Sequence, residues 1–517
     1  MDTRKNFLKG AMILSIAGAI SKVLGAIYRI PLARLLGGEG MGLYQMAYPI
    51  YTTILALATA GVPVAISVLV SRKETQGYSG DSRKIFRVSL LLLFIFGIIL
   101  TLLIMQCAHL LANYVLKEPR AYYPILAVAP AVFFSGLMSV FRGYFQGYQQ
   151  MMPTAVSQVI EQLFRVTAVL VLAFMFFPRG LEFAAAGATF GAVVGGLAGL
   201  FVLMIYYLRF KSASDRKGSK LLYSGVRSID LAKEVVKLAI PVSFGAVVLP
   251  LVQVLDAIIV PGRLMALNYT TSQATSLYGQ LSGMAAVLIS LPTIFTISIA
   301  TSLVPAVSEA IAQNDRQLLN NRINYGMRAG MLISLPCAAG LYILAFQICD
   351  LLYATAEAGI PLEPLAFSCI VLAAFQLSSA GLQGIGRPEI AMRNLIITGA
   401  LKVVFNYSLT SVPALNIRGA AIGTVLAFMI GSLLNIIYLK KITGVSYELG
   451  RLAKITAVTV VMALCVKITY QNLVNIGLIS HLATLAAICL GVAVYGVLLF
   501  VIKELDVGMV KSLLGKR

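Results

Sequence analysis

The sequence predicts an all-α polytopic membrane protein with about 14 transmembrane helices. Of its 517 residues, 59% are hydrophobic and only 12% are charged, whereas soluble domains carry roughly 25% charged residues. A soluble fold of this composition would expose apolar patches larger than soluble monomers tolerate. The apolar residues are also gathered into runs of about 20, the length that crosses a bilayer as a helix. These observations exclude an ordinary soluble enzyme, a disordered chain and a disulfide scaffold.

Fourteen apolar runs are expected to span the membrane, several of them with internal Pro or Gly, which spans tolerate when neighbouring groups satisfy the backbone. In chain order they are 10–33, 43–70, 86–108, 122–145, 154–177, 184–208, 236–260, 277–304, 325–347, 364–383, 391–412, 419–439, 453–471 and 482–502. The basic start resembles a signal peptide, but no small-residue cleavage site follows it, and Lys22 and Arg29 interrupt the apolar run. We therefore expect the first run to be retained as a span.

The distribution of Lys and Arg predicts which ends of the spans face the cytoplasm. With the N-terminus inside, the cytoplasmic segments hold 29 of the 41 basic residues and the outer segments hold six. Basic residues gather in the cytoplasmic loops of membrane proteins, so both termini are expected in the cytoplasm. The same topology accounts for most of the net charge of +21, and no nucleic-acid partner is expected.

The longest polar segment, 209–234, follows six spans and is predicted to link two halves. Gln146-Gly147 recurs as Gln383-Gly384, and Arg165 recurs as Lys402, both at an offset of 237 residues. Six spans per half make this repeat parallel, related by an axis along the membrane normal. The predicted organisation is an N-lobe (1–208), a cytoplasmic linker (209–234), a C-lobe (235–440) and two added helices with a cytoplasmic tail (441–517).

Six basic residues lie within the predicted spans, where each costs roughly 2.5–3.5 kcal/mol against lipid. They are Lys22, Arg29, Arg142, Arg165, Lys402 and Lys467. Such residues must line water, pair with acids, reach the interface or meet an anionic ligand. Only two acids, Glu161 and Asp256, lie clearly inside spans. A central cavity with this excess of positive charge should attract an anion.

Lys22 and Arg29 are the first candidates for binding that anion. They are seven residues apart, which is two helical turns, so they share one face of the first span. Lys22 lies too deep to reach the interface easily, and the alternative for Arg29 is to extend to the outer interface with Arg34. Arg34-Leu35-Leu36 recurs as Arg263-Leu264-Met265 on the predicted outer side. We expect Arg34 and Arg263 to form an outer gate.

The remaining intramembrane charges have competing interpretations. Glu161 precedes Arg165 by four residues, the favourable order for a helical ion pair, and the two residues either neutralise one another or bind the substrate. Lys402 lies at the depth of Arg165 but has Thr398 in the place of the acid. Arg142 lies near the cytoplasmic end of its span, and either binds the substrate or reaches the interface. We expect Lys467, near the outer end of its span, to reach the interface.

Asp256 lies in the seventh span, the repeat partner of the first. Three roles remain open: counter-ion to Lys22 or Arg29, a proton or cation site, or pairing within its own span. We favour the counter-ion role.

The sequence offers no sign of a cofactor or a metal. The six cysteines are scattered without a CxxC pair, and there are only two histidines. A Gly-rich loop followed by Lys-Ser or Lys-Thr, as in nucleotide hydrolases, does not occur. We therefore expect no metal, no cofactor and no ATP hydrolysis by this chain.

Four tracts resemble a known family. They are SKVLGAIYRIPLARLLGGEGMGLYQMAYPIY, FRGYFQGYQQMMPTAVSQVIEQLFRV, LPTIFTISIATSLVPAVSEA and NIRGAAIGT. With their spacing intact over the whole chain, these tracts are similar to the SpoVB/MurJ-type lipid II flippases, in the polysaccharide-transporter branch of the multidrug/oligosaccharidyl-lipid/polysaccharide exporter (MOP) superfamily.

The resemblance implies two six-helix lobes in a V around a central cationic cavity, with two further helices that form a lipid-facing groove. It implies that lipid II, the undecaprenyl-pyrophosphate-linked peptidoglycan precursor, moves from the inner to the outer leaflet of the bacterial plasma membrane. Lys22 and Arg29 would contact the pyrophosphate. Proteobacterial members have Arg at the position of Lys22 and a second Arg one residue before that of Arg29, so this chain is closer to the sporulation and Gram-positive branch.

The expected function is therefore a flippase that works by alternating access, driven by the membrane potential or by a Na⁺ or H⁺ gradient, with membrane lipids around an expected monomer. A cationic cavity would also accept another lipid-linked polysaccharide unit, of the capsule, teichuronic or O-antigen type. A drug/cation antiporter of the superfamily would have about 12 spans and a carboxylate-centred cation site. An enzyme of lipid-linked sugar assembly would need a soluble nucleotide-sugar domain or clustered loop carboxylates, and a structural scaffold would leave Lys22 and Lys402 unexplained.

Overall fold

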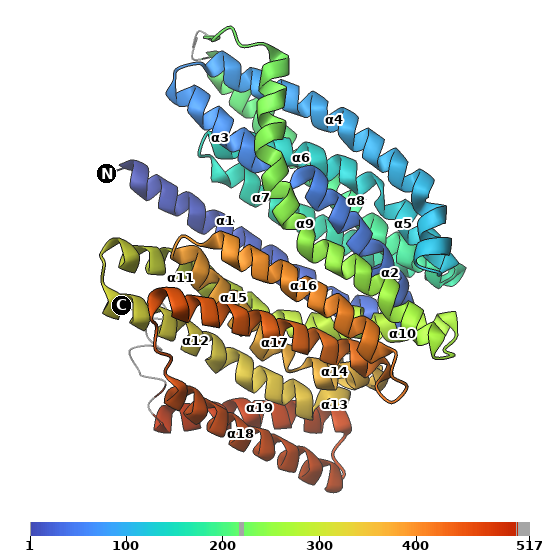
Figure 1. The fold of residues 1–517 in the computed structure, drawn as a ribbon. Coiled ribbons are helices and arrows are strands. Elements are labelled where there is room, and N and C mark those ends of the chain that lie inside the picture. Colours follow the sequence, from blue (N-terminus) through green and yellow to red (C-terminus); the bar gives the residue numbers. More distant parts are fainter. Residues whose placement is uncertain (1, 217–221, 503, 505–517) are drawn as a thin grey trace. The chain divides into compact units, whose positions relative to one another are not determined.

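The computed structural model describes residues 2–216, 222–502 and Glu504, and all of the regular structure in these residues is helical (Figure 1). The first ten α-helices are α1 (Asp2–Ile27), α2 (Arg29–Thr59), α3 (Val62–Thr75), α4 (Ser79–Leu110), α5 (Tyr122–Val128), α6 (Pro130–Gly147), α7 (Met151–Phe176), α8 (Leu181–Arg216), α9 (Ser228–Ala266) and α10 (Thr271–Gly279). The other nine are α11 (Ala286–Ala312), α12 (Arg316–Ile343), α13 (Ala345–Tyr353), α14 (Gly359–Leu365), α15 (Ser368–Gly384), α16 (Pro388–Thr410), α17 (Asn416–Thr443), α18 (Leu449–Asn475) and α19 (Ser480–Val501).

Short helical segments of other types complete the described chain. Two are π-helical, η1 (Leu111–Val115) and η4 (Gln280–Ala285), and three are 3-10 helices, η2 (Pro119–Ala121), η3 (Phe177–Arg179) and η5 (Ala356–Ala358). η1 directly continues α4, and η4 joins α10 to α11 without a break. These junctions let long apolar helices change pitch without exposing backbone groups to lipid.

Eleven helical segments in the described residues are long and apolar enough to cross a membrane, or up to twelve if a pair bent by 43° (Ala356–Leu365 and Ser368–Gly384) is one span. The sequence predicts about 14 spans, and the difference comes from the way in which three of these helical regions are counted. The first two predicted spans fall in one continuous apolar segment, Ile16–Thr75. The predicted span 391–412 is helical as α16, but it is not among these segments because its polar residues, Lys402 among them, lower its hydropathy.

The helices form two compact units. Unit 1 contains the residues up to Gly262 together with Thr270–Gly279, and unit 2 contains Arg263–Tyr269 together with the residues from Gln280 onward. The sequence-based boundary lies instead at the polar segment 209–234. Most of α9 and all of α10, which follow that segment, pack with the helices that precede it.

The first core lies among α3, α4 and α6, where Phe86 stacks on Tyr207 of α8 with 4.5 Å between ring centroids. The second core lies among α11, α12, α15 and α17, around Val307 and Leu439, which are both fully buried. In both units the helices bury small and aliphatic residues against one another and leave many large apolar side chains exposed. Exposed apolar side chains on such long helices are expected to face lipid.

A close backbone approach explains why α9 packs with unit 1. At the junction of α2 and α3, the backbone N–H of Gly61 donates to Ser243 Oγ of α9 at 3.1 Å. A Cβ on Gly61 would lie 2.0 Å from the carbonyl oxygen of Ala239, closer than any real contact. Only glycine therefore lets α9 lie against this junction.

Gly61→Ala is expected to destabilise unit 1 strongly, because the methyl group would collide with a backbone atom that cannot move alone. Overpacking of this kind costs typically 1–3 kcal/mol, so we expect the midpoint of thermal unfolding in detergent to fall by several degrees. Gly262→Ala is the matched control on α9, since a Cβ there meets no atom within 4 Å. Equal midpoints for the two variants would contradict the assigned role of Gly61.

The polar segment 209–234 is largely helical where it is described, because α8 continues to Arg216 and α9 begins at Ser228. Residues 217–221 of the predicted linker lie outside the described residues. The stretch that follows them is held against the start of α4. Gly80 donates its backbone N–H to the carbonyl of Leu222 at 2.9 Å. The fully buried carboxylate of Asp81 binds both Ser224 and, at 3.3 Å, Lys73 Nζ.

The two units repeat the same helical hairpin, as the sequence predicts for a parallel duplication. α6 ends at Gly147 and α15 ends at Gly384, and connections of equal length lead to α7 and α16. A Cβ on Gly147 would lie 2.7 Å from Cβ of Val70, and a Cβ on Gly384 would lie 2.7 Å from Cβ of Val307. Val70 and Val307 are themselves 237 residues apart. The offset that aligns the hairpins therefore also aligns the helices on which they pack.

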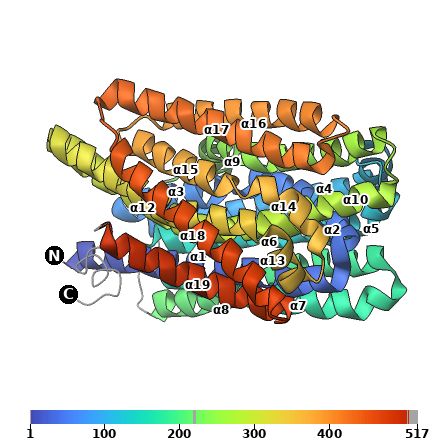
Figure 2. The ribbon, with the colours of Figure 1, turned by 90° about the horizontal axis from the view of Figure 1, so that it is seen from below.

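The last two helices follow the repeated part of the chain. α18 and α19 form an antiparallel pair beside α12 and α13 in unit 2 (Figures 1 and 2). Tyr495 of α19 donates its hydroxyl to the carbonyl of Leu332 of α12 at 2.9 Å. This hydrogen bond fixes α19 against the repeated helices.

Candidate substrate-binding site

Three charged side chains of unit 1 form a buried triad between α6 and α7. Arg165 Nη2 donates to Glu161 Oε1 at 2.6 Å, and Arg142 Nη2 donates to Glu161 Oε2 at 2.8 Å. The side chains of Arg142, Glu161 and Arg165 are 18%, 14% and 15% exposed. Burying charge this deeply is costly unless the charges are paired and hydrogen-bonded. The triad meets this condition and still leaves one positive charge in excess.

The triad bears on two of the sequence-based interpretations, that of Glu161 with Arg165 and that of Arg142. The predicted helical pair of Glu161 and Arg165 is confirmed. Arg142 also joins this pair, because its guanidinium binds Glu161 and its Nε donates to Ser157 Oγ at 3.2 Å. The sequence alone does not reveal this contact, since it joins residues on different helices.

Arg29 lies in a cluster of tyrosines at the start of α2. Its guanidinium lies 5.9 Å from the ring centroid of Tyr48, which stacks on Tyr44 at 5.5 Å. The hydroxyls of Tyr28 and Tyr44 are hydrogen-bonded at 3.0 Å. Tyr28 and Tyr48 are close enough to both Arg29 and Arg165 to interact with them electrostatically. The cluster therefore joins the first-span arginine to the triad.

The sequence analysis did not identify these tyrosines as site residues. Tyr44, Tyr48 and Tyr51 follow at intervals of four and three residues, the spacing that places side chains on one helical face. Tyr44 and Tyr51 are each only 2% exposed, and Tyr51 shares a hydrogen bond of 3.3 Å with Ser135 of α6. The stripe of hydroxyl-bearing aromatics at the start of the second predicted span was the available signal.

Two arginines of this cluster have spare donors. The Nε atoms of Arg29 and Arg165 are buried and have no hydrogen-bond partner among the described residues. Leaving such a group unpaired costs roughly 1–3 kcal/mol, and more when it is charged. The oxygen atoms of an anion would satisfy donors of this kind, and Arg is the side chain best suited to bind phosphate.

Lys22 and Arg34, the other basic residues proposed near the first span, have different surroundings. Lys22 is exposed on α1, two turns before Arg29, and Arg34 is exposed on α2. Of the pair that the sequence places on one face, only Arg29 is half-buried and lies among the tyrosines. The roles of Lys22 in binding and of Arg34 in gating stay predictions.

The equivalent site of unit 2 carries a single charged side chain, Lys402, and lacks the ion pairs of the triad. Thr398 stands where unit 1 has Glu161 and donates its hydroxyl to the carbonyl of Asn394 at 2.7 Å. Asn394 donates to Asn435 Oδ1, and Asn435 donates to Ser379 Oγ, both at 2.8 Å. Ser379 occupies the place of Arg142, and half-buried Lys402 occupies the place of Arg165. The same hairpin thus folds without the triad, so the charges of unit 1 are not required by the fold.

The remaining predicted site residues are divided between the units. Asp256 is half-buried on the part of α9 that belongs to unit 1, and its role as a counter-ion stays a prediction. Arg263 belongs to unit 2, where its guanidinium lies 3.4 Å from the ring centroid of Tyr407 on α16. Stacking on a tyrosine ring satisfies a guanidinium without a carboxylate.

A second charged cluster lies at the predicted outer end of unit 1, where α10 packs on α2. Glu118 is 1% exposed. It accepts hydrogen bonds from Arg120 Nε at 2.9 Å and from Thr275 Oγ1 at 2.7 Å, while Arg120 also binds Glu39 at 2.7 Å. Burial disfavours the Glu118 carboxylate, but the bonds from Arg120 and Thr275 outweigh it and lower its pKa below the ordinary value. The cluster ties α10 to η2 and α2.

Glu118→Gln is expected to lower the midpoint of thermal unfolding at pH 7 by about 5 °C, since charge-assisted hydrogen bonds contribute roughly 1.5–3 kcal/mol. Because the folded pKa of Glu118 is lowered, its stabilisation is complete above the ordinary Glu pKa of about 4.3 and is lost as the pH falls through the folded pKa. The difference between wild type and variant should therefore shrink in acid.

Glu448→Gln is the control for this measurement, because its partner Arg451 is 51% exposed and exposed pairs contribute little. A gap between wild type and Glu118→Gln that stays constant from pH 7 to pH 3 would refute the role given to the Glu118 carboxylate.

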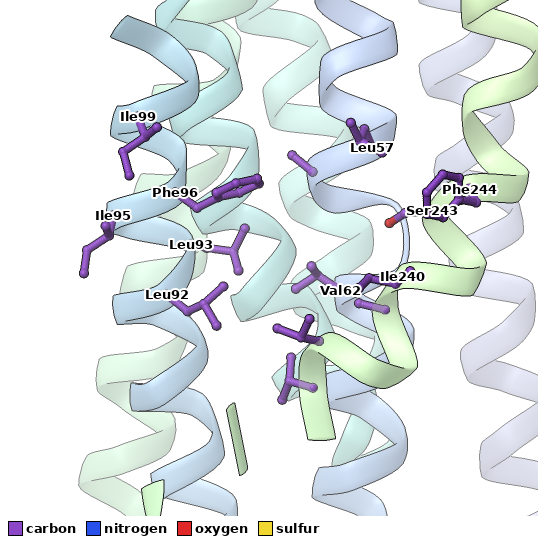
Figure 3. Close-up of a pocket in the computed structure, with 14 residues that line it drawn as sticks. Leu57, Val62, Leu92, Leu93, Ile95, Phe96, Ile99, Ile240, Ser243 and Phe244 are labelled. Atoms are coloured by element: carbon purple, nitrogen blue, oxygen red, sulfur yellow. The ribbon is translucent and has the colours of Figure 1, made fainter. Parts of the chain in front are cut away.

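Each unit also has an apolar groove. In unit 1 a groove of about 560 Å³ lies among α2, α3, α4 and α9 (Figure 3). Phe96 and Leu93 of α4 face Ile240 and Phe244 of α9 across it, with Ser243 as the single polar lining residue. Its lining contains no charge, so this groove is distinct from the basic cluster.

The groove of unit 2 differs because it carries a cation. It has a volume of about 720 Å³ and lies among α11, α12 and α19, with Leu303, Ile333 and Val492 among its walls. Arg322, which is exposed and lies in the second turn of α12, also lines it, together with Tyr325. An apolar groove with a guanidinium toward one end suits an amphiphile with an anionic head.

No group of three or more His, Cys, Asp or Glu side chains that could hold a metal ion occurs in the described part of the chain.

Fold and site together define a class of protein. The long apolar helices make it a multi-pass membrane protein. Ionisable residues buried on span helices mark the pathways of substrates or ions through such proteins, so the class is that of membrane transporters.

Comparison with known proteins gives the family. A family model described as polysaccharide biosynthesis protein matches residues 7–311, and one described as MatE matches residues 265–408. The chain is 32% identical to stage V sporulation protein B of Bacillus subtilis, over 97% of this chain and 96% of that protein. It is 30% identical to the lipid II flippase MurJ of the same organism, over 89% and 88%. The chain therefore belongs to the polysaccharide biosynthesis protein family, in its SpoVB/MurJ group, and is a transporter rather than an enzyme.

Solved structures agree on the fold. The lipid II flippase MurJ in an inward closed conformation matches with a TM-score of 0.73 at 16% identity, over 95% of this chain and 99% of that one. An inward-facing multidrug resistance MATE family transporter matches with a TM-score of 0.68 at 16% identity, over 82% and 94%.

Proposed function

We propose that this protein flips a polyprenyl-diphosphate-linked cell-wall precursor, with lipid II as the first candidate, from the inner to the outer leaflet of the bacterial plasma membrane. The observation that carries the proposal is the basic cluster of unit 1, where Arg29 and Arg165 each keep a buried, unpartnered Nε. A diphosphate supplies the oxygens that these donors lack. The similarity to a sporulation protein and to a lipid II flippase supports the same substrate class.

The diphosphate of the substrate matches the guanidiniums of unit 1, and its isoprenoid chain matches the apolar groove of unit 2. A charged diphosphate with sugars cannot cross hydrocarbon alone, because burying unpaired charge is prohibitive. The guanidiniums of unit 1 replace the water that the diphosphate loses. The groove of unit 2, with apolar walls and Arg322 among its lining residues, fits an isoprenoid chain next to an anionic group. Only the head group needs protein, since the rest of the tail is soluble in lipid.

The membrane potential supplies a driving force for this cycle. An inside-negative potential favours outward movement of an anion by about 2.3 kcal/mol per charge per 100 mV. It also draws an emptied cationic site back toward the inside. We therefore propose alternating access driven by the potential, with Na⁺ or H⁺ coupling through Asp256 as the alternative drive.

Purified protein in sealed proteoliposomes tests the proposal. Fluorescent lipid II placed in one leaflet should move to the other at a rate that depends on the protein and rises when a potassium diffusion potential is imposed. Movement that ignores the potential but follows a Na⁺ or pH gradient would reject the potential as the drive. Absence of movement under all three conditions would reject lipid II as the substrate.

A second candidate is another lipid-linked glycan. It is favoured by the similarity to a probable low-salt glycan biosynthesis flippase of Haloferax volcanii, 23% identical over 33% of this chain. Rescue of a strain depleted of its own lipid II flippase separates the two candidates. Growth restored by this chain supports lipid II, and failure with normal membrane insertion supports the other glycan.

A further inference from the structure

The Glu161 carboxylate is divided between two guanidiniums. Its Oε1 binds Arg165 and its Oε2 binds Arg142, in each case through one Nη2 atom. A fork-to-fork pair would instead engage both carboxylate oxygens with one guanidinium, which is the stronger arrangement. Glu161 therefore holds each arginine with less than the full strength of a bidentate pair.

The two arginines differ in what else holds them. Arg142 Nε donates to Ser157 Oγ, and the Ser157 hydroxyl in turn donates to the carbonyl of Thr154 at 2.8 Å. Arg165 Nε is buried without a hydrogen-bond partner among the described residues. Arg142 is thus fixed from two sides, while Arg165 retains an unused donor beside the Arg29 and tyrosine cluster. Of the two arginines, Arg165 is therefore the one that can exchange its contact with Glu161 for a contact with another anion.

The charge balance favours such an exchange. The guanidiniums of Arg29, Arg142 and Arg165 and the carboxylate of Glu161 leave a net charge of +2 in the buried cluster. A diphosphate, with two or more negative charges, is the anion that neutralises it. A site without Glu161 would bind this ligand more tightly, but a transporter must also release what it binds.

We propose that Glu161 is a built-in competitor anion. It occupies Arg165 while the site is empty, gives up that contact to a phosphate oxygen of the arriving prenyl diphosphate, and recovers it when the ligand leaves. Glu161 thereby weakens ligand binding and speeds release. This inference rests on the proposed function, because it assumes that a diphosphate is the ligand.

Comparison of the repeats supports a functional rather than a structural role. Thr398 takes the place of Glu161 in unit 2, and the hairpin of α16 and α17 forms around it. A Cβ on Gly195 would lie 2.8 Å from Cβ of Arg165, and a Cβ on Gly431 would lie 3.1 Å from Cβ of Thr398. Both α7 and α16 thus pack on a glycine of the helix that follows, whereas only α7 carries a carboxylate at this place.

The test uses farnesyl diphosphate as the ligand and farnesol as its uncharged analogue, with the full chain in detergent. Glu161→Gln keeps the shape of the side chain and removes its charge. We expect the variant to bind farnesyl diphosphate about tenfold more tightly than wild type, a difference of about 1.4 kcal/mol, with no change for farnesol. In proteoliposomes the variant should move fluorescent lipid II more slowly than wild type.

Two further variants keep the test decisive. Glu161→Thr, taken from unit 2, should behave like Glu161→Gln and replaces it if the glutamine variant does not fold. Glu389→Gln removes an acid from an exposed pair with Arg387 and should bind like wild type.

If wild type binds farnesyl diphosphate and the Glu161 variants bind it equally or more weakly, the competitor role is wrong and the proposed function stands. If none of the proteins binds it, the proposed function itself fails, and the competitor role fails with it.

Discussion

Arg29→Ala is expected to reduce lipid II movement in proteoliposomes by about 100-fold while the protein remains folded in the membrane. Arg29 is half-buried, its Nε lacks a partner among the described residues, and its guanidinium faces the ring of Tyr48. Its loss removes charge-assisted hydrogen bonds worth roughly 1.5–3 kcal/mol each, and a 100-fold change corresponds to about 2.7 kcal/mol. Arg29→Lys should recover only part of the rate, because lysine offers a point charge without the planar fork.

The control for this experiment is Lys467→Ala. Lys467 is exposed on α18, so its loss should leave the rate unchanged and show that removal of a cation from a span is not harmful in itself. Lys22→Ala separates two interpretations of the first span. A loss like that of Arg29→Ala would establish that the exposed Lys22 also meets the substrate. Normal rates in both variants would remove the first span from the binding site.

Glu161→Ala is expected to be the most destabilising single change in the triad. It would leave two buried guanidiniums without their shared carboxylate, and loss of one partner of a buried ion pair costs about 3–5 kcal/mol. The double variant Arg142→Ser with Glu161→Thr installs the residues that unit 2 has at these places, Ser379 and Thr398. It should recover most of the lost stability, because the repeat shows that the hairpin forms without both charges.

The double variant should remain inactive although it is stable. Thermal unfolding in detergent measures the first property, and lipid II movement in proteoliposomes measures the second. A double variant no more stable than Glu161→Ala would contradict the equivalence of the two hairpins. A double variant with wild-type transport would remove Arg142 and Glu161 from the site.

The parts of the structure that depend on local helix geometry could be predicted from the sequence. Glu161 and Arg165 meet because residues four apart on a helix are neighbours. The duplication could be read from Gln146-Gly147 and Gln383-Gly384, because these pairs end equivalent helices before connections of equal length. An all-helical membrane fold followed from the apolar composition and from apolar runs of about 20 residues.

Contacts between helices could not be predicted in the same way. Arg142 meets Glu161 only because of the register in which α6 packs on α7, and no sequence interval encodes that register. The tyrosines form a helical stripe that the sequence shows, but no sequence interval places Tyr28 beside Tyr44 or the stripe beside Arg29. The polar segment 209–234 suggests a boundary in the sequence, whereas the close approach of Gly61 to Ala239 places most of α9 in the first compact unit.

At α9 and α10 the division into compact units does not follow the order of the chain. Unit 1 takes Thr270–Gly279 from a stretch whose neighbours on both sides belong to unit 2. A cut in the polar segment at 217–221 would therefore give an amino-terminal fragment without two of its own helices. Co-expressed fragments divided there should assemble only when α9 and α10 of the carboxy-terminal fragment pack on the amino-terminal fragment. Neither fragment should be protease-resistant when it is produced alone. Gene fusions or split reporters inserted at this site would consequently report assembly of the whole molecule rather than folding of one half.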